Sequence, residues 1–208
     1  MLRPQNVAGL FPEDPKRVRL CTGIELRIPL IGEEFAPIAA TQQRFSAEEA
    51  DVIQLEVKKL ADRGVIREST SAWATICVTV RKKDGNLRLC QDYRALNSCM
   101  RTDSDGLGNT LEMFRRMSGN SWFTFIDRAS GFFQLPIVEA DRHKMAFRDA
   151  FGRLWEYARC GFGLKILTPT FASVVADLLG DLKGNGMEND LDDNLIYSGD
   201  FGLSLIHI

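Results

Sequence analysis

Asp190-Leu191-Asp192-Asp193-Asn194-Leu195-Ile196-Tyr197-Ser198 places two adjacent carboxylates in an otherwise apolar run. The residues that follow the acidic pair have strand-forming character. Carboxylates in such a position cost free energy unless a positive group meets them. A divalent metal ion is one candidate, because it prefers oxygen ligands. The alternative is an acidic surface turn that is simply solvated.

A further carboxylate, that of Asp127, ends the most strand-like segment of the chain, Ser121 to Asp127. Its near-continuous apolar run predicts a central strand that is buried on both faces. An acid at the end of a buried strand is costly if it has no role, so such positions are frequently functional sites. The alternative is that Asp127 caps a short helix from Ala129 to Leu135.

A hairpin with a basic tip is predicted between Ala74 and Gln91. Its two apolar runs are separated by Arg81-Lys82-Lys83-Asp84-Gly85-Asn86, and Asp-Gly is a strong tight-turn signal. Three consecutive cations repel one another, and Arg88 follows on the returning strand. A triphosphate would suit this arrangement, since Arg offers a bidentate fork and Lys a point charge. The alternative is a charged tip that deters edge aggregation.

The remaining segments predict a mixture of helices and strands. Ser46 with Glu49 is a capping box, which opens a helix of about Ala47 to Arg63 closed by Gly64. The other expected elements are a strand at Gly23 to Leu30; a helix at Thr110 to Met117 with Leu111, Phe114 and Met117 inward; a hairpin from Lys144 to Arg148 and Leu154 to Tyr157; and a helix from Thr168-Pro169 to about Leu182 with Phe171, Val174, Val175, Leu178 and Leu179 inward.

Composition gives weaker but consistent indications. The 208 residues are 45% hydrophobic, enough for one substantial core or two small lobes. Ten Lys and Arg stand against six Asp and Glu between Asp51 and Arg101, whereas seven acids stand against Lys183 alone between Ala176 and Ile208. This asymmetry suits a protein that meets phosphates in one half and cations in the other, although ordinary surface scatter is the simpler explanation.

The location of the protein is predicted from its cysteines and its hydropathy. The five cysteines are widely spaced and form no CxxC or Cys/His cluster, which argues against structural zinc and favours reduced thiols. Neither a signal peptide nor an apolar run of membrane-spanning length is present. We therefore expect an intracellular protein that does not associate with a membrane.

Six motifs, in order, resemble the reverse transcriptase of gypsy-type LTR retrotransposons over about Gly23 to Phe201. Each motif is weak alone, but a chance match to all six in order is very improbable. They are Gly64-Val65-Ile66-Arg67-Glu68-Ser69-Thr70-Ser71-Ala72-Trp73-Ala74; Val80-Arg81-Lys82-Lys83-Asp84-Gly85 through Arg88 to Asp92-Tyr93-Arg94-Ala95-Leu96-Asn97; Phe125-Ile126-Asp127 with Ser130-Gly131-Phe132; Lys144-Met145-Ala146-Phe147; Phe162-Gly163-Leu164; and Leu191-Asp192-Asp193 with Ile196-Tyr197-Ser198.

The resemblance implies an α+β fold, the fingers and palm of a right-hand polymerase, with an antiparallel palm sheet packed on helices and the thumb absent. The implied organisation is an extended arm (1–45), fingers and the start of the palm (46–118), and the rest of the palm with the catalytic acids (119–202). Residues 203–208 read like the translated end of a sequencing-library adapter, so we expect them to be an artefactual tail.

The resemblance also implies an RNA-directed DNA polymerase with two Mg²⁺ ions, or Mn²⁺ in their place. Asp127, Asp192 and Asp193 would be the catalytic metal ligands, and Lys82 and Arg88 would grip the phosphates of a dNTP. Phe132 would lie under the sugar and exclude a 2′-hydroxyl, and Phe162 would line the base and sugar pocket. The implied partners are a primed RNA or DNA template, dNTPs, and the thumb, ribonuclease H and integrase domains of a polyprotein in the cytoplasm or a virus-like particle.

One departure from the family pattern bears on activity. Asp190 occupies the position where the family usually has an aromatic residue. The added charge would either weaken primer placement or raise the pKa of a neighbouring carboxylate by like-charge repulsion. Two alternatives to an active polymerase therefore stay open: an inactive relic of such a domain, and a nucleic-acid-binding module without catalysis.

Overall fold

The computed structural model describes residues 20–21, 23–32, 36–41, 43–83, 85–101, 110–127, 131–190 and 193–200. The chain divides into two compact units that interleave in sequence. We call the described residues within 20–103 and 132–167 the hairpin unit, and those within 104–131 and 168–208 the carboxylate unit. The arm before residue 20 and the tail 203–208 lie outside the described residues, and the predicted domain boundaries stay predictions.

Helix α1 (Ala47–Asp62) begins and ends as its sequence signals predict. The Ser46 hydroxyl accepts a bond from the Glu49 N–H at 3.3 Å, and the Glu49 carboxylate accepts one from the Ser46 N–H at 2.9 Å. Gly64 follows the helix with a φ of 62°, the left-handed conformation that glycine tolerates best. The predicted inward residues Ile53, Val57 and Leu60 are all buried.

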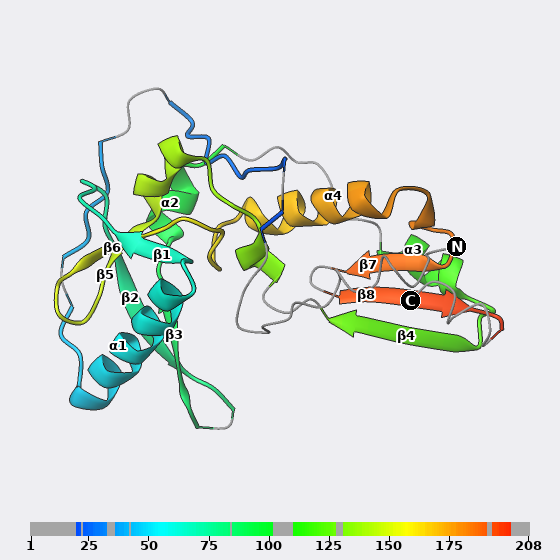
Figure 1. Ribbon diagram of the computed structural model, residues 1–208, viewed down its shortest axis with the longest axis horizontal. Helices are drawn as coiled ribbons and strands as arrows, with labels where there is room; N and C mark the ends of the chain where they lie inside the picture. Colours follow the sequence, from blue (N-terminus) through cyan, green and yellow to red (C-terminus); the bar gives the residue numbers. More distant parts are fainter. Residues whose placement is uncertain are drawn as a thin grey trace. The chain divides into compact units, whose positions relative to one another are not determined.

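A five-stranded sheet forms the hairpin unit together with α1 and α2 (Arg94–Cys99). β2 and β3 form the predicted antiparallel hairpin, with Val80 the partner of Arg88. β2 also pairs with β5 in parallel, while β5 and β6 form the second predicted hairpin. The strand order is β1-β6-β5-β2-β3, with β1 Ile66–Glu68, β2 Thr75–Arg81, β3 Leu87–Gln91, β5 Ala146–Arg148 and β6 Leu154–Tyr157 (Figure 1).

One expectation for the hairpin unit is wrong. Gly23 to Leu30 is not a strand, because only Leu26 and Leu30 make bridges, and these go to the separate residues Ile137 and Met100 rather than to one ladder. The segment is extended because Leu26 and Ile28 are buried in the core. In the alternative helix at Ala129 to Leu135, the described part is a 3₁₀ turn, η2 (Gly131–Gln134), and Ala129 and Ser130 lie outside the described residues. Another 3₁₀ helix, η3 (Glu139–Met145), was not predicted.

A three-stranded antiparallel sheet is the centre of the carboxylate unit. Figure 1 shows β8 between β4 and β7. This unit also contains nearly all of the long helix near the C-terminus, which ends three residues earlier than expected and continues as a 3₁₀ turn. Its elements are α3 Thr110–Met117, β4 Trp122–Asp127, α4 Leu167–Leu179, η4 Gly180–Leu182, β7 Met187–Asp190 and β8 Asp193–Ser198.

The predicted burial of this unit is only partly correct. β4 is an edge strand of the described sheet rather than a central one. Phe125 is 73% exposed, and Trp122 and Phe123 are also exposed. An apolar run shows that a strand can be buried on both faces, but in β4 Thr124 and Ile126 are half-buried while Phe125 is exposed. Met117, Phe171, Val174 and Val175 are buried as expected, whereas Leu111, Phe114 and Leu178 are exposed.

Candidate functional site

The end of the three-stranded sheet brings together the segments that carry the predicted metal ligands. Asp127 is the last residue of β4 and Asp193 the first residue of β8, and the two are directly opposite in antiparallel register. Asp193 is also the register partner of Asp190, the last residue of β7. An acidic position from each strand therefore lies in one row across the sheet.

The register fits a divalent cation, although the side chains at its centre are not all described. Asp192 and the side chains of Asp127 and Asp190 lie outside the described part of the chain, whereas the Asp193 side chain is exposed. Within that part, no three His, Cys, Asp or Glu side chains are grouped so as to hold a metal ion. Like charges directly opposite on neighbouring strands are destabilising, and a bound cation would offset this repulsion.

A buried ion pair supports β7 close to this row. The Arg116 Nε of α3 donates to the Glu188 carboxylate of β7 at 2.6 Å, and Glu188 is only 2% exposed. This hydrogen bond raises the pKa of Arg116 above its ordinary value. Glu188 and Asp190 lie two residues apart in β7, so the Arg116–Glu188 ion pair joins α3 to the strand that ends at Asp190.

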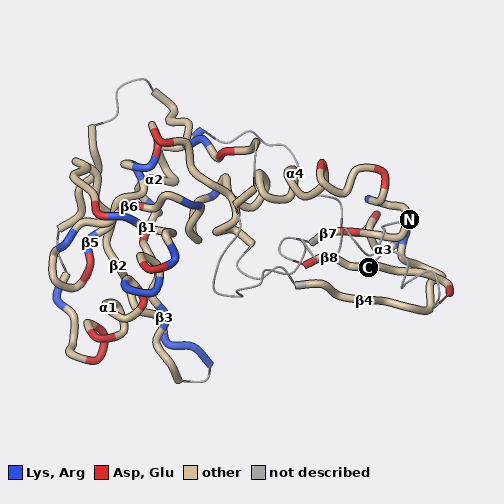
Figure 2. Tube along the Cα trace, viewed as in Figure 1, with Lys and Arg blue, Asp and Glu red and all other residues tan. Residues whose placement is uncertain are grey.

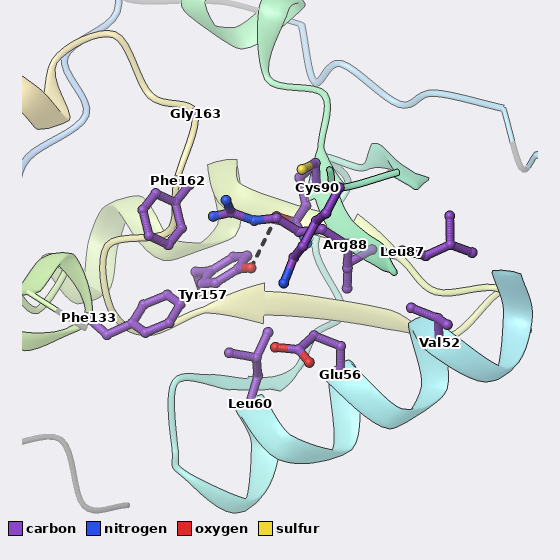
Figure 3. A pocket seen from close by; sticks show the side chains of 13 residues that line it. Val52, Glu56, Leu60, Leu87, Arg88, Cys90, Phe133, Tyr157, Phe162 and Gly163 are labelled. Atoms are coloured by element: carbon purple, nitrogen blue, oxygen red, sulfur yellow. Dashed lines mark hydrogen bonds between the residues drawn. The ribbon is translucent and has the colours of Figure 1, made fainter. Parts of the chain in front are cut away.

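Three of the four predicted nucleotide-binding residues line one pocket of about 300 Å³ in the hairpin unit. Lys82 and Arg88 come from the β2–β3 hairpin, and Phe162 comes from the loop that follows β6. The opposite wall is α1, which contributes Val52, Glu56 and Leu60 (Figure 3). Figure 2 shows Lys and Arg gathered towards the tip of this hairpin.

The fourth predicted residue, Phe132, supports the pocket without lining it. Phe132 is buried, and its ring packs edge-on against Phe162 with the centroids 5.3 Å apart. Phe133 packs against the same ring at 5.8 Å and does line the pocket. The Arg88 guanidinium carbon lies 5.0 Å from the Phe162 centroid, a cation–π contact visible in Figure 3. The pocket therefore combines cationic groups with an aromatic surface.

Two polar residues of the pocket were missed by the sequence analysis. The Tyr157 hydroxyl donates to the Gln91 side-chain oxygen at 3.1 Å, and burial raises the pKa of Tyr157. The Gln91 side-chain nitrogen is buried and has no acceptor among the described residues. No local signal identifies the two, because they meet only through the fold.

The acidic row belongs to the carboxylate unit, whereas Lys82, Arg88, Phe132 and Phe162 belong to the hairpin unit. Each set is therefore described within its own unit. Carboxylate oxygens suit a cation, and cations with aromatic rings suit an anionic nucleotide. The metal-binding and nucleotide-binding roles of these residues stay predictions.

The sequence is similar to parts of retrotransposon polyproteins. No protein-family model matches the chain. The transposon Tf2-7 and Tf2-8 polyproteins of Schizosaccharomyces pombe are each 29% identical to it over 143 residues, which is 69% of this chain and 11% of the polyprotein. The chain thus spans about a tenth of the length of these curated relatives.

The fold is similar to that of foamy viral reverse transcriptases. A foamy viral protease-reverse transcriptase in complex with RNA/DNA hybrid aligns with a TM-score of 0.84 and 22% identity, over 98% of this chain and 27% of that one. A second structure, in complex with double-stranded DNA, aligns with a TM-score of 0.80 and 23% identity, over 96% of this chain and 34% of that one. The predicted α+β fold and the resemblance given by the six motifs are confirmed.

Proposed function

We propose that this chain is the fingers and palm of an RNA-directed DNA polymerase. The support is its fold, which is similar to that of foamy viral reverse transcriptases, and its similarity to retrotransposon polyproteins. The reaction is attack of a primer 3′-hydroxyl on the α-phosphate of a dNTP, with loss of pyrophosphate. The observation that carries the proposal is the register pairing of Asp127 with Asp193 at the end of the three-stranded sheet. It joins two acidic segments that only the motif resemblance had linked.

The acids are proposed to hold the metal ions. Asp127 and Asp192 are the principal ligands and Asp193 completes the set. Bound Mg²⁺ or Mn²⁺ lowers the pKa of the primer hydroxyl and neutralises charge on the triphosphate and the leaving group. The chain itself contributes the placement, because the paired strands β4 and β8 hold the backbone of Asp127 directly opposite that of Asp193.

The pocket of the hairpin unit is proposed to take the nucleotide. Lys82 and Arg88 bind the β- and γ-phosphates, Lys82 as a point charge and Arg88 as a fork. Phe162 contacts the base and sugar, and Phe132 limits the space at the 2′ position. The edge-on packing of the buried Phe132 ring on the partly exposed Phe162 ring supports this, because it restrains Phe162.

The proposed partners are a primed RNA or DNA template, dNTPs and the other domains of a polyprotein, including a thumb, a ribonuclease H and an integrase. No described helix of the chain is long and apolar enough to cross a membrane. The proposed setting is intracellular, in the cytoplasm or in a virus-like particle.

Primer extension on poly(rA)/oligo(dT) with Mg²⁺ tests the reaction. The chain is compared with Asp192→Asn and with Asp200→Asn, a control acid that lies beyond β8. We expect extension that Asp192→Asn reduces by at least about a hundredfold, in line with the loss of a charge-stabilising group, and that Asp200→Asn leaves intact. Extension that survives Asp192→Asn would contradict the site.

The two alternatives give different results in the same assay. An inactive relic binds the primer–template but extends nothing with either metal. A nucleic-acid-binding module binds the duplex with affinity that falls with salt, and it does so equally with or without metal.

A further inference from the structure

Asn97 joins two segments of the hairpin unit that are far apart in sequence. It lies in α2, and its side-chain nitrogen donates to the Gly163 carbonyl at 2.7 Å. Its side-chain oxygen accepts from the Lys165 N–H at 2.9 Å. A single asparagine amide therefore both donates to and accepts from one loop, across 66 to 68 residues of sequence.

The loop that Asn97 holds is the loop that presents Phe162. Gly163 has a φ of 102°, which side-chain-bearing residues rarely adopt. A Cβ at Gly163 would lie 3.4 Å from the Tyr93 ring and 3.7 Å from the Gln91 carbonyl, so the backbone passes close to the start of α2 and the end of β3. The Tyr93 ring is in turn fixed by a bond from its hydroxyl to the Met145 carbonyl at 3.1 Å.

The hold on this loop is concentrated in one side chain. Among the described residues, the two bonds from Asn97 are the only side-chain hydrogen bonds made to residues 162–165. Phe162 itself is 44% exposed and is contacted by Arg88 from the pocket side and by Phe132 from beneath. Without Asn97, Gly163 and Lys165 would lose the two side-chain hydrogen bonds that join them to α2.

We propose that Asn97 is a positioning residue for the nucleotide pocket. By fixing Gly163 and Lys165, it sets the position of the Phe162 ring and thereby the affinity for the base and sugar of a dNTP. This inference rests on the proposed function and deepens it. Asn97 does not touch the nucleotide; it acts through the loop.

The proposed role of Asn97 concerns the base and sugar of a dNTP and not its triphosphate. The triphosphate is proposed to bind Lys82 and Arg88 on the β2–β3 hairpin, to which Asn97 makes no hydrogen bond among the described residues. The base and sugar are held by Phe162, which the Asn97 loop carries. Loss of Asn97 should therefore weaken binding of a dNTP much more than binding of inorganic tripolyphosphate, whereas general damage to the fold would weaken both.

The experiment measures binding of Mg²⁺–dTTP and of Mg²⁺–tripolyphosphate by titration calorimetry on the full chain. Asn97→Ala removes both bonds, and Asn97→Asp keeps the acceptor for Lys165 but replaces the donor to Gly163 with a repelling carboxylate. Ser98→Ala is the control on the same helix, because among the described residues its hydroxyl bonds only to Ala95 and Cys99 of α2 itself. Amide hydrogen exchange at Lys165 reports the loop directly.

We expect Asn97→Ala to weaken dTTP binding roughly tenfold, as the loss of two hydrogen bonds allows, and tripolyphosphate binding less than about twofold. The dTTP affinity of Asn97→Asp lies between those of Asn97→Ala and the unsubstituted chain, and the affinity of Ser98→Ala equals that of the unsubstituted chain. The Lys165 amide exchanges faster in Asn97→Ala. If Asn97→Ala does not fold, Asn97→Asp decides.

Two outcomes contradict the role in distinguishable ways. Equal dTTP affinity in the unsubstituted chain and in the Asn97 variants overturns the role of Asn97 and leaves the proposed function standing. An unsubstituted chain that binds tripolyphosphate but shows no preference for dTTP overturns the nucleotide pocket itself, and the role of Asn97 with it.

Discussion

Arg88 and Phe162 meet across the pocket of the hairpin unit, with the guanidinium carbon 5.0 Å from the ring centroid. The contact joins the group proposed to bind phosphate to the group proposed to bind the base and sugar. A cation–π contact at a partly exposed site contributes about 0.5–1 kcal/mol. A triphosphate that draws Arg88 away must therefore offset this contact.

Arg88→Ala should weaken Mg²⁺–dTTP binding by about tenfold or more, because a charge-assisted hydrogen bond contributes about 1.5–3 kcal/mol. Arg88→Lys should recover only part of the loss, since Lys keeps the charge but not the fork. Titration calorimetry at two salt concentrations measures both. Arg81→Ala is the matched control, because Arg81 bonds the Gly85 carbonyl at the tip and does not line the pocket. An equal loss in Arg81→Ala would show that only the net charge of the hairpin matters.

Arg116→Ala should destabilise the carboxylate unit by about 3 kcal/mol, because it leaves the buried Glu188 carboxylate without its partner. Urea unfolding measures the change. The neighbouring Arg115→Ala should cost less than about 0.5 kcal/mol, since Arg115 is exposed and its pair with Glu112 is a surface pair. The double variant Arg116→Met, Glu188→Met should be more stable than Arg116→Ala; if it is less stable, the buried charge is not the cause.

Glu49→Gln should make the stability of the fold depend less on pH in acid. Hydrogen bonds from the Thr79 hydroxyl and the Ser46 backbone lower the pKa of Glu49 below its ordinary value of 4.5. A carboxyl with a lowered folded-state pKa adds stability above its unfolded pKa, and this stability is lost as the pH falls through the folded value. The melting temperature from pH 7 down to about pH 3 should therefore fall less steeply in Glu49→Gln. Glu48→Gln, the exposed neighbour, is the control and should follow the unsubstituted chain.

Asp190→Asn should stabilise the metal-free chain by about 0.5 kcal/mol, because it removes a like charge directly opposite Asp193. Thermal melting in the presence of a chelator measures this. Addition of Mg²⁺ should reduce the difference in melting temperature between Asp190→Asn and the unsubstituted chain, since the cation offsets the same repulsion. A metal-free Asp190→Asn chain that melts below the unsubstituted one would show that the two carboxylates do not repel.

Local signals predicted most of the secondary structure. The Ser46–Glu49 capping box gave the start of α1, and Asp84-Gly85 gave the β2–β3 hairpin, because each is decided by neighbours in sequence. The exposure of Phe125 was not predictable, since an apolar pattern records what a strand can bury and not what covers it.

The resemblance predicted that the acidic segments meet on an antiparallel palm sheet, but it did not give their register. The resemblance supplied Asp127 and Asp193, but their direct register pairing depends on how β4 and β8 align, which no spacing in the sequence fixes. The two bonds from Asn97 to the Phe162 loop have no sequence signal at all, because a half-buried asparagine in a short helix has many structural uses.

Binding of Mn²⁺ measured by electron paramagnetic resonance tests the central claim most directly, because it reports the acidic row without the need for catalysis. The unsubstituted chain should bind Mn²⁺, and Asp127→Asn and Asp192→Asn should each weaken that binding by at least about tenfold, as the loss of a ligand charge requires. Asp200→Asn should bind as the unsubstituted chain does. Mn²⁺ affinity that is the same in all four proteins would contradict the assignment of this row as a polymerase metal site.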